Sequence, residues 1–395
     1  MSVSPTPARL LVVDDNDDNR FTLLQRLKRQ GYTDAATAAN GREALDMLGQ
    51  RTFDLVLLDV MMPELNGYEV LEQMKADQRL RDVPVIMISA LDQIESVVRC
   101  IELGAEDYLA KPFNPTLLRA RVGASLEKKR LRDELRASLS RLEKEMDAAR
   151  RLQAGMLPHE FAASSSDYPV ELHALMEPAR EVGGDLYDFF RASADTLAFV
   201  VADVSGKGAD AALFMARTCS SVRIATELFQ QLGAESLSPA RVLDVVNREL
   251  CQNNGECMFV TVFLGFLDMK SGVLDYSNAG HPSPYRLGAT VDPERLSGEP
   301  QLPLGIGSAH SYETHRVALA PGEAVFVCSD GIAEAMNGAG EFYGEARLAA
   351  ALHESRAAAP SAMIGDIRSA VESFAAGAPQ ADDITMLALR WQPPG

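Results

Sequence analysis

The sequence predicts a multidomain α/β protein in which two folded parts are joined by a long helix. Its 395 residues exceed what one ordinary hydrophobic core holds, so length alone predicts two or three domains. Apolar runs alternate with helical patterns in the first third of the chain, whereas later several apolar runs follow one another directly. Between these parts, residues 124–157 contain no proline and one glycine. We therefore expect domains at 8–123 and 158–392 and a helical linker at 124–157.

The first domain is expected to contain a parallel sheet with helices on both faces. Its apolar runs are Arg9–Val13, Phe53–Asp59, Pro84–Ser89 and Asp107–Lys111. They are apolar at nearly every position and are separated by amphipathic stretches such as Gly41–Gln50, which is the pattern of a doubly wound fold. Ligands of such sheets bind at the carboxyl ends of the strands, so the side chains there are candidates for function.

Five polar side chains end or follow these runs: Asp14, Asp15, Asp59, Ser89 and Lys111. Neighbouring strand ends bring them to one edge of the sheet. Three carboxylates repel one another unless a cation neutralises them, and oxygen ligands suit Mg²⁺. A carboxylate beside the ion can then attack a phosphoryl group, whose oxygens pair with the lysine and accept a hydrogen bond from the serine. Helix capping explains single acids at such places, but not five groups together.

These residues lie in motifs that resemble the receiver domain of bacterial response regulators. The motifs are VVDD, LLDVMMPELNG, MISA and the run from Asp107-Tyr108 to Lys111-Pro112-Phe113, and they span about residues 8–123. The resemblance implies a flavodoxin-like fold with Asp59 as the phosphoacceptor. It further implies a histidine kinase or a phosphotransfer protein as the phosphodonor.

The resemblance also assigns roles to the neighbours of Asp59. The implied Mg²⁺ ligands are Asp14 (through water), Asp15, Asp59 and the backbone of Met61. The implied switch residues are Ser89, Tyr108 and Lys111, and a cis peptide bond before Pro112 is expected to place the lysine.

The linker shows a heptad seam. Its positions follow one another at spacings of 4, 3, 4, 3, 4 and 3, and they are Leu135, Leu139, Leu142, Met146, Ala149, Gln153 and Met156. This spacing favours a two-stranded coiled coil and hence a homodimer, with a single solvated helix as the alternative. The seam is imperfect because Gln153 is polar, and Pro158 ends it.

The last part of the chain predicts an α+β domain with largely antiparallel strand pairing. The expected strands are 170–175, 196–203, 257–268, 273–279, 323–330 and 384–391, and helical patterns follow Ala209, Pro239, Glu345 and Pro360. The stretch Val200–Ala212 carries Gly206-Lys207, but it lacks the GxxxxGK and Ser or Thr of a nucleotide-binding loop.

Acids stand at strand ends or turns in four segments of this domain. The acids are Asp185 with Asp188, Asp203, Asp330, and Asp382 with Asp383. Converging carboxylates without basic partners are unfavourable unless divalent ions lie between them. Two such ions can acidify a bridging water and stabilise an in-line displacement at phosphorus. This pattern predicts metal-dependent hydrolysis of a phosphate ester.

Seven motifs of this region resemble the SpoIIE/RsbU branch of the metal-dependent type-2C protein phosphatases. They are, in order over about residues 150–392, LQAGMLP, PAREVGGDLYD, ADVSGKG, NAGHPSPY, PLGIG, SDGIAEA and ADDIT. The resemblance implies an αββα sandwich with two Mn²⁺ or Mg²⁺ ions. The implied activity is hydrolysis of phosphoserine or phosphothreonine on a protein, mostly an anti-sigma-factor antagonist in this family.

The implied metal ligands are Asp185, Asp203, the carbonyl of Val204, Asp330 and Asp382. Asp203 is expected to bridge the two ions and, with Asp330 and Asp382, to activate the attacking water. Asp383 is expected to support the ligands without binding an ion. His281 has two readings, a general acid or a packing residue, and Lys207 is expected to be solvated or paired.

Two other function classes are weighed against this enzyme. A non-catalytic adaptor for a sigma factor or an anti-sigma partner is the alternative, but the predicted ligand acids are all present, which favours the enzyme. A net charge of −18, with 56 acids against 38 basic residues, argues against DNA binding. We expect no membrane partner and a cytoplasmic protein, because the sequence shows neither a transmembrane run nor a signal peptide, and its five cysteines form no CxxC pair.

Overall fold

The computed structural model describes residues 8–90, 94–158, 169–180, 182–233, 237–299 and 301–393. The chain divides into two compact units, an N-terminal unit up to Leu142 and a C-terminal unit from Glu143. Within the described ranges, no helix is both long enough and apolar enough to cross a membrane.

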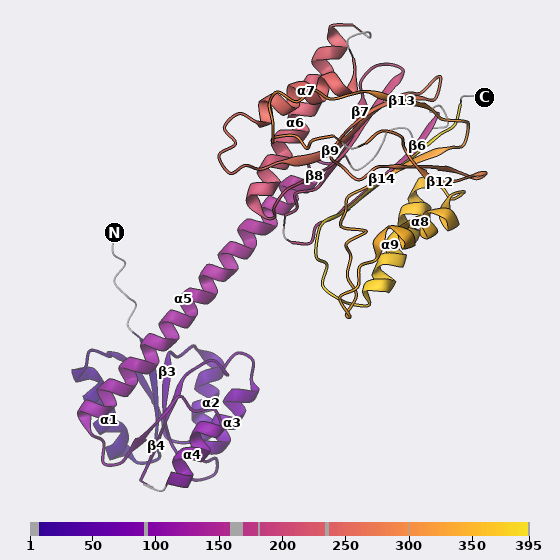
Figure 1. Cartoon of the computed structure of the whole chain (residues 1–395). Coiled ribbons are helices and arrows are strands. Elements are labelled where there is room, and N and C mark those ends of the chain that lie inside the picture. The colour runs from indigo at the N-terminus through magenta and orange to yellow at the C-terminus, as the bar shows by residue number, and fades with distance from the viewer. Residues whose placement is uncertain are drawn as a thin grey trace. The chain divides into compact units, whose positions relative to one another are not determined.

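The N-terminal unit is a five-stranded parallel sheet in the order β2-β1-β3-β4-β5 (Figure 1). Its strands are β1 (Arg9–Val13), β2 (Asp34–Ala38), β3 (Leu55–Asp59), β4 (Val85–Ser89) and β5 (Asp107–Ala110). Its helices are α1 (Asp17–Arg29), α2 (Gly41–Gln50), α3 (Gly67–Ala76), α4 (Ile94–Glu102) and the start of α5 (Pro115–Ala154). Four strands were predicted. The fifth, β2, escaped prediction because its residues, DAATA, form no apolar run and lie at the edge of the sheet.

Alternate residues of the strands fill two separate cores, one on each face of this sheet. On one face, residues such as Leu11 and Leu58 pack against α2 and α3. On the other face, residues such as Leu10 pack against α1 and against Leu118 and Val122 of α5. Because both faces are buried, the strands are apolar at almost every position, and the predicted doubly wound fold is confirmed.

Helix α5 departs from the predicted linker at both ends. It begins at Pro115, within the N-terminal unit, and it ends at Ala154, so Met156 lies in the turn beyond it. The seam leucines Leu135, Leu139 and Leu142 are 61%, 50% and 55% exposed. Gln153, in contrast, is only 7% exposed, which shows that the end of the helix packs differently from its middle.

The C-terminal unit consists of two five-stranded antiparallel sheets. The first sheet has the order β13-β10-β9-β8-β7, with β13 (His315–Ala318), β10 (Val273–Ala279), β9 (Val260–Asp268), β8 (Thr196–Val204) and β7 (Leu186–Arg191). The second has the order β12-β11-β14-β15-β6, with β12 (Val291–Arg295), β11 (Tyr285–Gly288), β14 (Ala324–Cys328), β15 (Ile384–Trp391) and β6 (Val170–Glu177). The antiparallel α+β prediction is confirmed, although β7, β11, β12 and β13 were not predicted.

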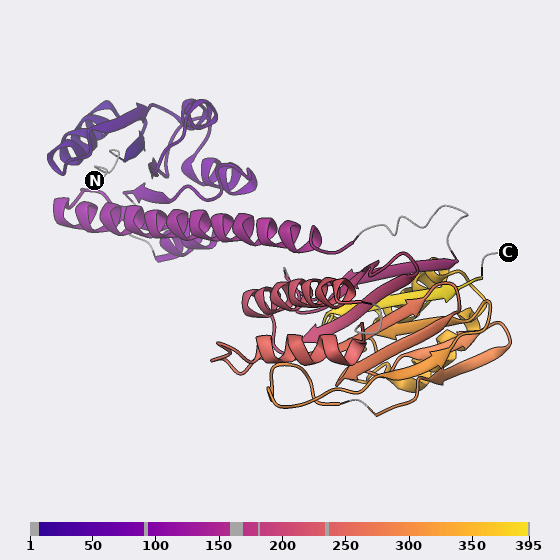
Figure 2. The ribbon, with the colours of Figure 1, turned by 90° about the horizontal axis from the view of Figure 1, so that it is seen from above.

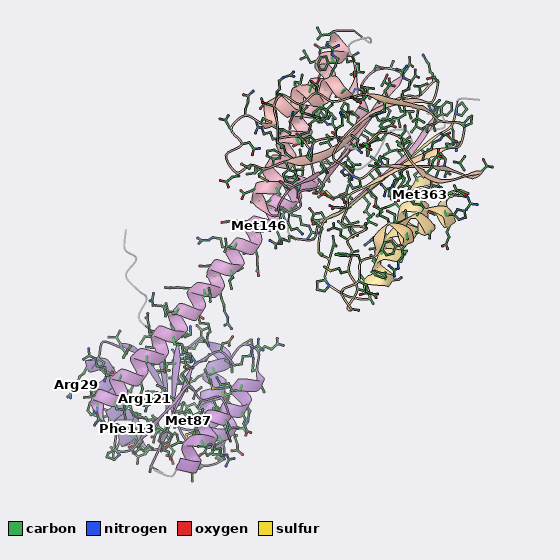
Figure 3. The ribbon with its side chains drawn as sticks, in the orientation of Figure 1. Arg29, Met87, Phe113, Arg121, Met146 and Met363 are labelled. Carbon is green, nitrogen blue, oxygen red and sulfur yellow. The ribbon has the colours of Figure 1, made fainter. Side chains whose placement is uncertain are left out.

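Four helices cover the outer faces of these sheets (Figure 2). They are α6 (Ala209–Gln231), α7 (Pro239–Leu250), α8 (Gly344–Ser355) and α9 (Pro360–Ala375), at the predicted places. The main core joins α6 and α7 to the first sheet and continues into the inner face of the second. A smaller core, which includes Met363, joins the second sheet to α8 and α9 (Figure 3). The layers therefore follow the expected αββα order.

Candidate metal and phosphoryl-transfer sites

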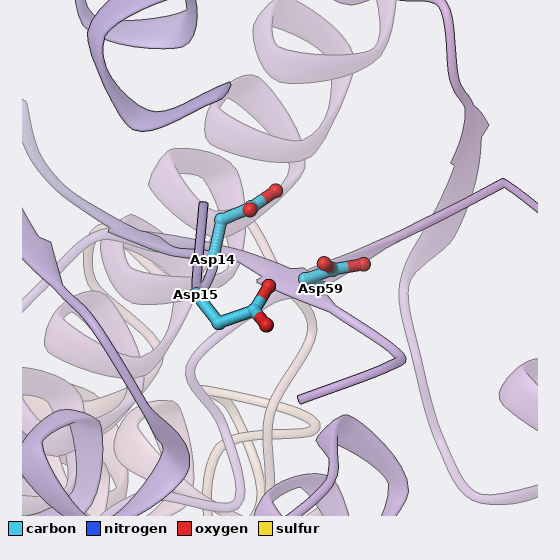
Figure 4. A group of neighbouring side chains, drawn as sticks. All are labelled: Asp14, Asp15 and Asp59. Carbon is cyan, nitrogen blue, oxygen red and sulfur yellow. The ribbon is translucent and has the colours of Figure 1, made fainter. Parts of the chain in front are cut away.

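The three acids predicted to hold Mg²⁺ in the N-terminal unit lie together (Figure 4). Asp14 follows β1 and Asp59 ends β3, and these two strands pair in parallel, so their carboxyl ends are neighbours. One carboxylate oxygen from each of Asp14, Asp15 and Asp59 lies within 4.8 Å of the other two. Asp14 and Asp59 are buried and Asp15 is exposed. An oxygen-rich, partly buried group of this kind fits a hard divalent cation.

Lys111 neutralises part of this acidic charge. Its Nζ lies 2.8 Å from Asp14 Oδ2 and 2.7 Å from Asp59 Oδ2. Burial lowers the pKa of Lys111, but the hydrogen bonds to the two acids outweigh that effect and raise it. Burial also raises the pKa of Asp59, against the opposing hydrogen bond from Lys111. The Lys111-Pro112 peptide bond is cis, as predicted.

The remaining predicted residues surround this group. Ser89 is buried at the end of β4, which pairs with β3, and Tyr108 lies half-buried on β5. The Met61 side chain is 63% exposed, whereas its backbone N–H bonds to Asp59. Gly67 permits the close approach of α3, because a Cβ atom there would lie 2.2 Å from the carbonyl oxygen of Asp59. The structure thus supplies a place for each predicted residue, while its role stays a prediction.

Both sheets of the C-terminal unit contribute to the second acidic group. Asp185 precedes β7 and Asp203 lies in β8 of the first sheet, whereas Asp330 follows β14 and Asp382 precedes β15 of the second. The side chain of Asp203 contacts those of Asp185 and Asp330. Within the described ranges, the N-terminal acids are the one group of at least three whose members each offer a ligand atom within 4.8 Å of the others.

Burial and the charges of neighbouring acids raise the pKa values of Asp185, Asp203 and Asp330. Burial raises the pKa of Asp185 well above its usual range, and the charge of Asp203 raises it further. Burial, followed by the charge of Asp330, raises the pKa of Asp203 to about 7. Lys207 pairs with Asp382 at 3.0 Å and is the one cation in the described structure paired with any of these four acids. The group therefore carries excess negative charge that fits divalent cations.

The raised pKa of Asp203 predicts that the metal-free protein loses stability as the pH rises. A carboxyl group whose pKa is higher in the folded state stabilises the fold at low pH, and this contribution is lost as the pH rises through the folded value. For a folded pKa of about 7, roughly 1 kcal/mol is lost between about pH 6 and pH 8. In EDTA we expect the melting temperature to fall by about 3 °C over this range.

The single tryptophan, Trp391, is buried in the C-terminal core, so its fluorescence follows the unfolding of that unit. Added Mn²⁺ is expected to abolish this fall in melting temperature, because the bound ion neutralises the carboxylates in place of the protons. The Asp203→Asn variant is expected to show a smaller fall than the parent. An equal fall in parent and variant contradicts the assignment.

Backbone geometry holds the acids in place. Asp383, which is buried, accepts hydrogen bonds from the backbone N–H groups of Ala179 and Gly184, both at 2.7 Å. A Cβ atom on Gly184 would lie 2.9 Å from the carbonyl oxygen of Val204, so glycine lets the chain of Asp185 approach the predicted carbonyl ligand. These contacts agree with the expected supporting role of Asp383.

Two buried polar residues, Asp188 and His281, have contacts unlike those of the four acids. Asp188 is buried but forms a two-pronged ion pair with Arg223, with both distances 2.5 Å, so it is already neutralised. His281 is fully buried, its Nδ1 lies 2.9 Å from Thr261 Oγ1, and burial lowers its pKa to about 3. A neutral, buried imidazole agrees with the packing reading, because it carries no proton to donate as an acid at neutral pH.

Gln153 is a functional candidate that the heptad pattern concealed. Its Nε2 donates to the carbonyl of Gly183 at 2.6 Å, and its Oε1 accepts from the N–H of Gly183 at 3.1 Å. Gly183 lies two residues before Asp185. A polar residue at an apolar seam position was the signal that the end of the helix contacts something other than a second helix.

The fold and these sites define a class of protein in which a receiver domain is joined to a type-2C phosphatase fold. Residues 10–123 match the response regulator receiver domain, and residues 193–392 match the family described as Stage II sporulation protein E (SpoIIE). The chain belongs to the SpoIIE family.

Two solved structures are similar to a part of this chain. The SiaA-PP2C domain of Pseudomonas aeruginosa is 23% identical, with a TM-score of 0.57, over 65% of this chain and 99% of that one. That likeness shows the fold. The RsbU and RsbW domains of Rv1364c from Mycobacterium tuberculosis are 26% identical, with a TM-score of 0.47, over 58% of this chain and 62% of that one.

Among curated proteins, the transcriptional regulatory protein PhoP of Bacillus subtilis is 43% identical over 121 residues, which are 30% of this chain and 49% of PhoP. The ycf27 regulator of Cyanidium caldarium is 43% identical over 119 residues, which are 30% of this chain and 46% of that protein. The chain thus spans about half the length of the curated relatives it matches.

Proposed function

We propose that this chain is a two-component response regulator in which phosphorylation of Asp59 controls a metal-dependent protein serine/threonine phosphatase. The observation that carries the proposal is the second acidic group. Asp185, Asp203 and Asp330 come from two sheets, Asp203 contacts both of the other acids, and burial raises the pKa of all three. Repulsion of this kind lowers the stability of the folded protein unless divalent ions bind between the acids.

The chain's own residues divide the work at this centre. Two Mn²⁺ or Mg²⁺ ions, held by Asp185, Asp203, Asp330, Asp382 and the Val204 carbonyl, would supply an acidified water and charge stabilisation at phosphorus. Asp383 fixes the chain before Asp185 through backbone hydrogen bonds. Lys207 balances one negative charge of Asp382.

Exposed apolar side chains beside the centre support a protein substrate. Phe259, Leu302 and Ile306 are 37%, 37% and 54% exposed. Ser205, which follows Asp203 and Val204, donates its backbone N–H to the carbonyl of Phe259 at 2.8 Å, so this surface adjoins the acids. Apolar surface of this kind is typical of protein contacts. We propose a phosphorylated anti-sigma-factor antagonist as the substrate.

Helix α5 supports control of this centre by the receiver. It runs without interruption from the core around Leu118 to the hydrogen bonds between Gln153 and Gly183. Its exposed seam leucines favour pairing with a second copy of the chain, and we include this homodimer in the proposal. A change in helix pairing on phosphorylation would then reach the loop that carries Asp185.

The proposal is tested by measuring hydrolysis of candidate phosphoserine proteins with Mn²⁺, before and after acetyl phosphate treatment. We expect acetyl phosphate to change the rate, and sedimentation to show a dimer. The Asp59→Asn variant is expected to incorporate no phosphoryl group and to show no change in rate, whereas Asp18→Asn, an exposed acid nearby, retains both. If the parent has equal rates with and without acetyl phosphate, the proposed control by Asp59 phosphorylation is contradicted. If the parent is inactive but binds a sigma factor, the result favours the non-catalytic adaptor.

Replacement of Gln153 by alanine is expected to weaken metal binding at the C-terminal centre. The variant loses both hydrogen bonds to Gly183 and frees the loop before Asp185. Partners that orient metal ligands typically contribute about 10- to 100-fold in affinity or activity. We therefore expect the Mn²⁺ concentration for half-maximal activity to rise at least about tenfold. Leu152→Ala, an exposed neighbour, is the control, and equal Mn²⁺ dependence in both variants contradicts the role of Gln153.

A further inference from the structure

A second feature beside the C-terminal acids is a small apolar cavity. It has a volume of about 300 Å³ and lies between the turn after Asp330, the end of α9 and the segment before Asp382. Gly331 and Ala381 both line it, so its wall begins one residue from each of these two acids. The apolar side chains that line it include Ala335, Met336, Val371, Ala375 and Ile384.

The charges around this cavity are already engaged. Glu177 and Glu372 line it, and both pair with Arg368, at 2.6 Å and 3.0 Å. None of the lining residues is a lysine, arginine or histidine, so the cavity offers no charge to a phosphate group. Its interior therefore suits an apolar group of a ligand whose phosphoryl group is bound at the neighbouring acids.

Hydrogen bonds within the chain hold the walls of the cavity. Gln380 donates to the carbonyls of Glu177 and Asp382, both at 2.8 Å, which fixes the segment before β15. Helix α9 ends at Ala375, and the left-handed conformation of the next residue, Ala376 (φ 48°), turns the chain into this segment. The cavity is thus a formed feature of the fold, and its volume is at the small end of ligand pockets, which suits one side chain.

We propose that this cavity binds an apolar side chain of the phosphoprotein substrate, within three residues of the phosphorylated serine or threonine. The inference rests on the proposed function, because the phosphoryl group must lie at the metal centre. Consecutive residues of an extended peptide are about 3.5 Å apart along the chain. A residue near the phosphorylated one therefore reaches a cavity whose wall adjoins Asp330 and Asp382. The cavity then selects substrates by the residue that flanks the phosphate.

The test uses the full chain with Mn²⁺ and a series of phosphoserine peptides that carry leucine, glutamate, lysine or glycine at each of the three positions on either side. At one position we expect kcat/KM to be about tenfold higher for leucine than for glutamate or lysine, as one apolar pocket typically discriminates. The Ala375→Phe variant fills the cavity and is expected to reduce this preference below about twofold. Its hydrolysis of p-nitrophenyl phosphate, which has no flanking residue, is expected to equal that of the parent.

Ala362→Phe is the matched control, since Ala362 is exposed on the same helix and outside the cavity. The cavity proposal is overturned by equal rates for all flanking residues, by a preference for lysine, or by a leucine preference that survives in Ala375→Phe. If the parent hydrolyses neither the peptides nor p-nitrophenyl phosphate, the proposed function fails. Fluorescence anisotropy of the labelled peptides then still decides on the cavity, because the leucine peptide should bind the parent more tightly than Ala375→Phe does.

Discussion

Replacement of Asp203 by asparagine is expected to abolish phosphatase activity while leaving the metal-free protein folded. Asp203 touches acids of both sheets, so its loss removes the group that joins the two parts of the centre. Metal ions contribute several kcal/mol of transition-state stabilisation, and a loss of about 4 kcal/mol corresponds to roughly a thousandfold in rate. We therefore expect kcat/KM with p-nitrophenyl phosphate to fall about a thousandfold or more.

The same substitution has the opposite effect on the protein without metal. Asparagine carries no charge, so the burial of a charge and its repulsion by Asp330, which raise the pKa of Asp203, no longer oppose the fold. At about pH 8 in EDTA, the variant should therefore melt no lower than the parent by Trp391 fluorescence. Asp366→Asn, an exposed acid on α9, is the control for both measurements. Unchanged activity in Asp203→Asn contradicts the metal role, and a lower melting temperature without metal contradicts the electrostatic argument.

Replacement of Gly331 by alanine is expected to damage both the fold and the centre. A Cβ atom at this position would lie 2.0 Å from the backbone carbonyl oxygen of Asp383 and 3.5 Å from the carbonyl carbon of Asp382. Since both contacts are to backbone atoms, no side-chain rotation relieves them. Overpacking of this kind costs about 1–3 kcal/mol, which is several degrees in melting temperature for a unit of this size. Misplacement by about 1 Å can lower activity about a hundredfold.

The control for this variant is Gly338→Ala, because a Cβ atom there meets nothing within 4 Å. The two substitutions lower the conformational freedom of the unfolded chain equally, so the difference between them isolates the clash. We expect Gly338→Ala to keep the parent's melting temperature within about 1 °C. If Gly331→Ala also keeps the parent's melting temperature, the result contradicts the close packing of the two loops that carry Asp330 and Asp382.

Much of the N-terminal unit could be predicted, because its strands and helices follow from patterns of residues that are close together in the sequence. Strands buried on both faces must be apolar throughout, so Leu55–Asp59 and Val85–Ser89 were visible as runs. Parallel pairing then puts Asp14 and Asp59 at one edge whatever the details of packing. Strand β2 could not be recognised in the sequence, because a half-buried edge strand of alanine and threonine need not be apolar at every position.

The sequence by itself determined the two-part α/β architecture and which residue types gather at the strand ends, because periodicity and glycine placement are local properties of the chain. Tertiary structure alone decided which of these acids form an ion pair with a basic side chain in the described part of the chain. Asp185 and Asp188 stand three residues apart in one motif, yet Arg223 of α6 neutralises the second while the first lies beside Asp203. Likewise, only folding shows that Gln153 contacts Gly183. Such pairings join residues far apart in sequence, and their energies depend on burial and distance, which no local pattern encodes.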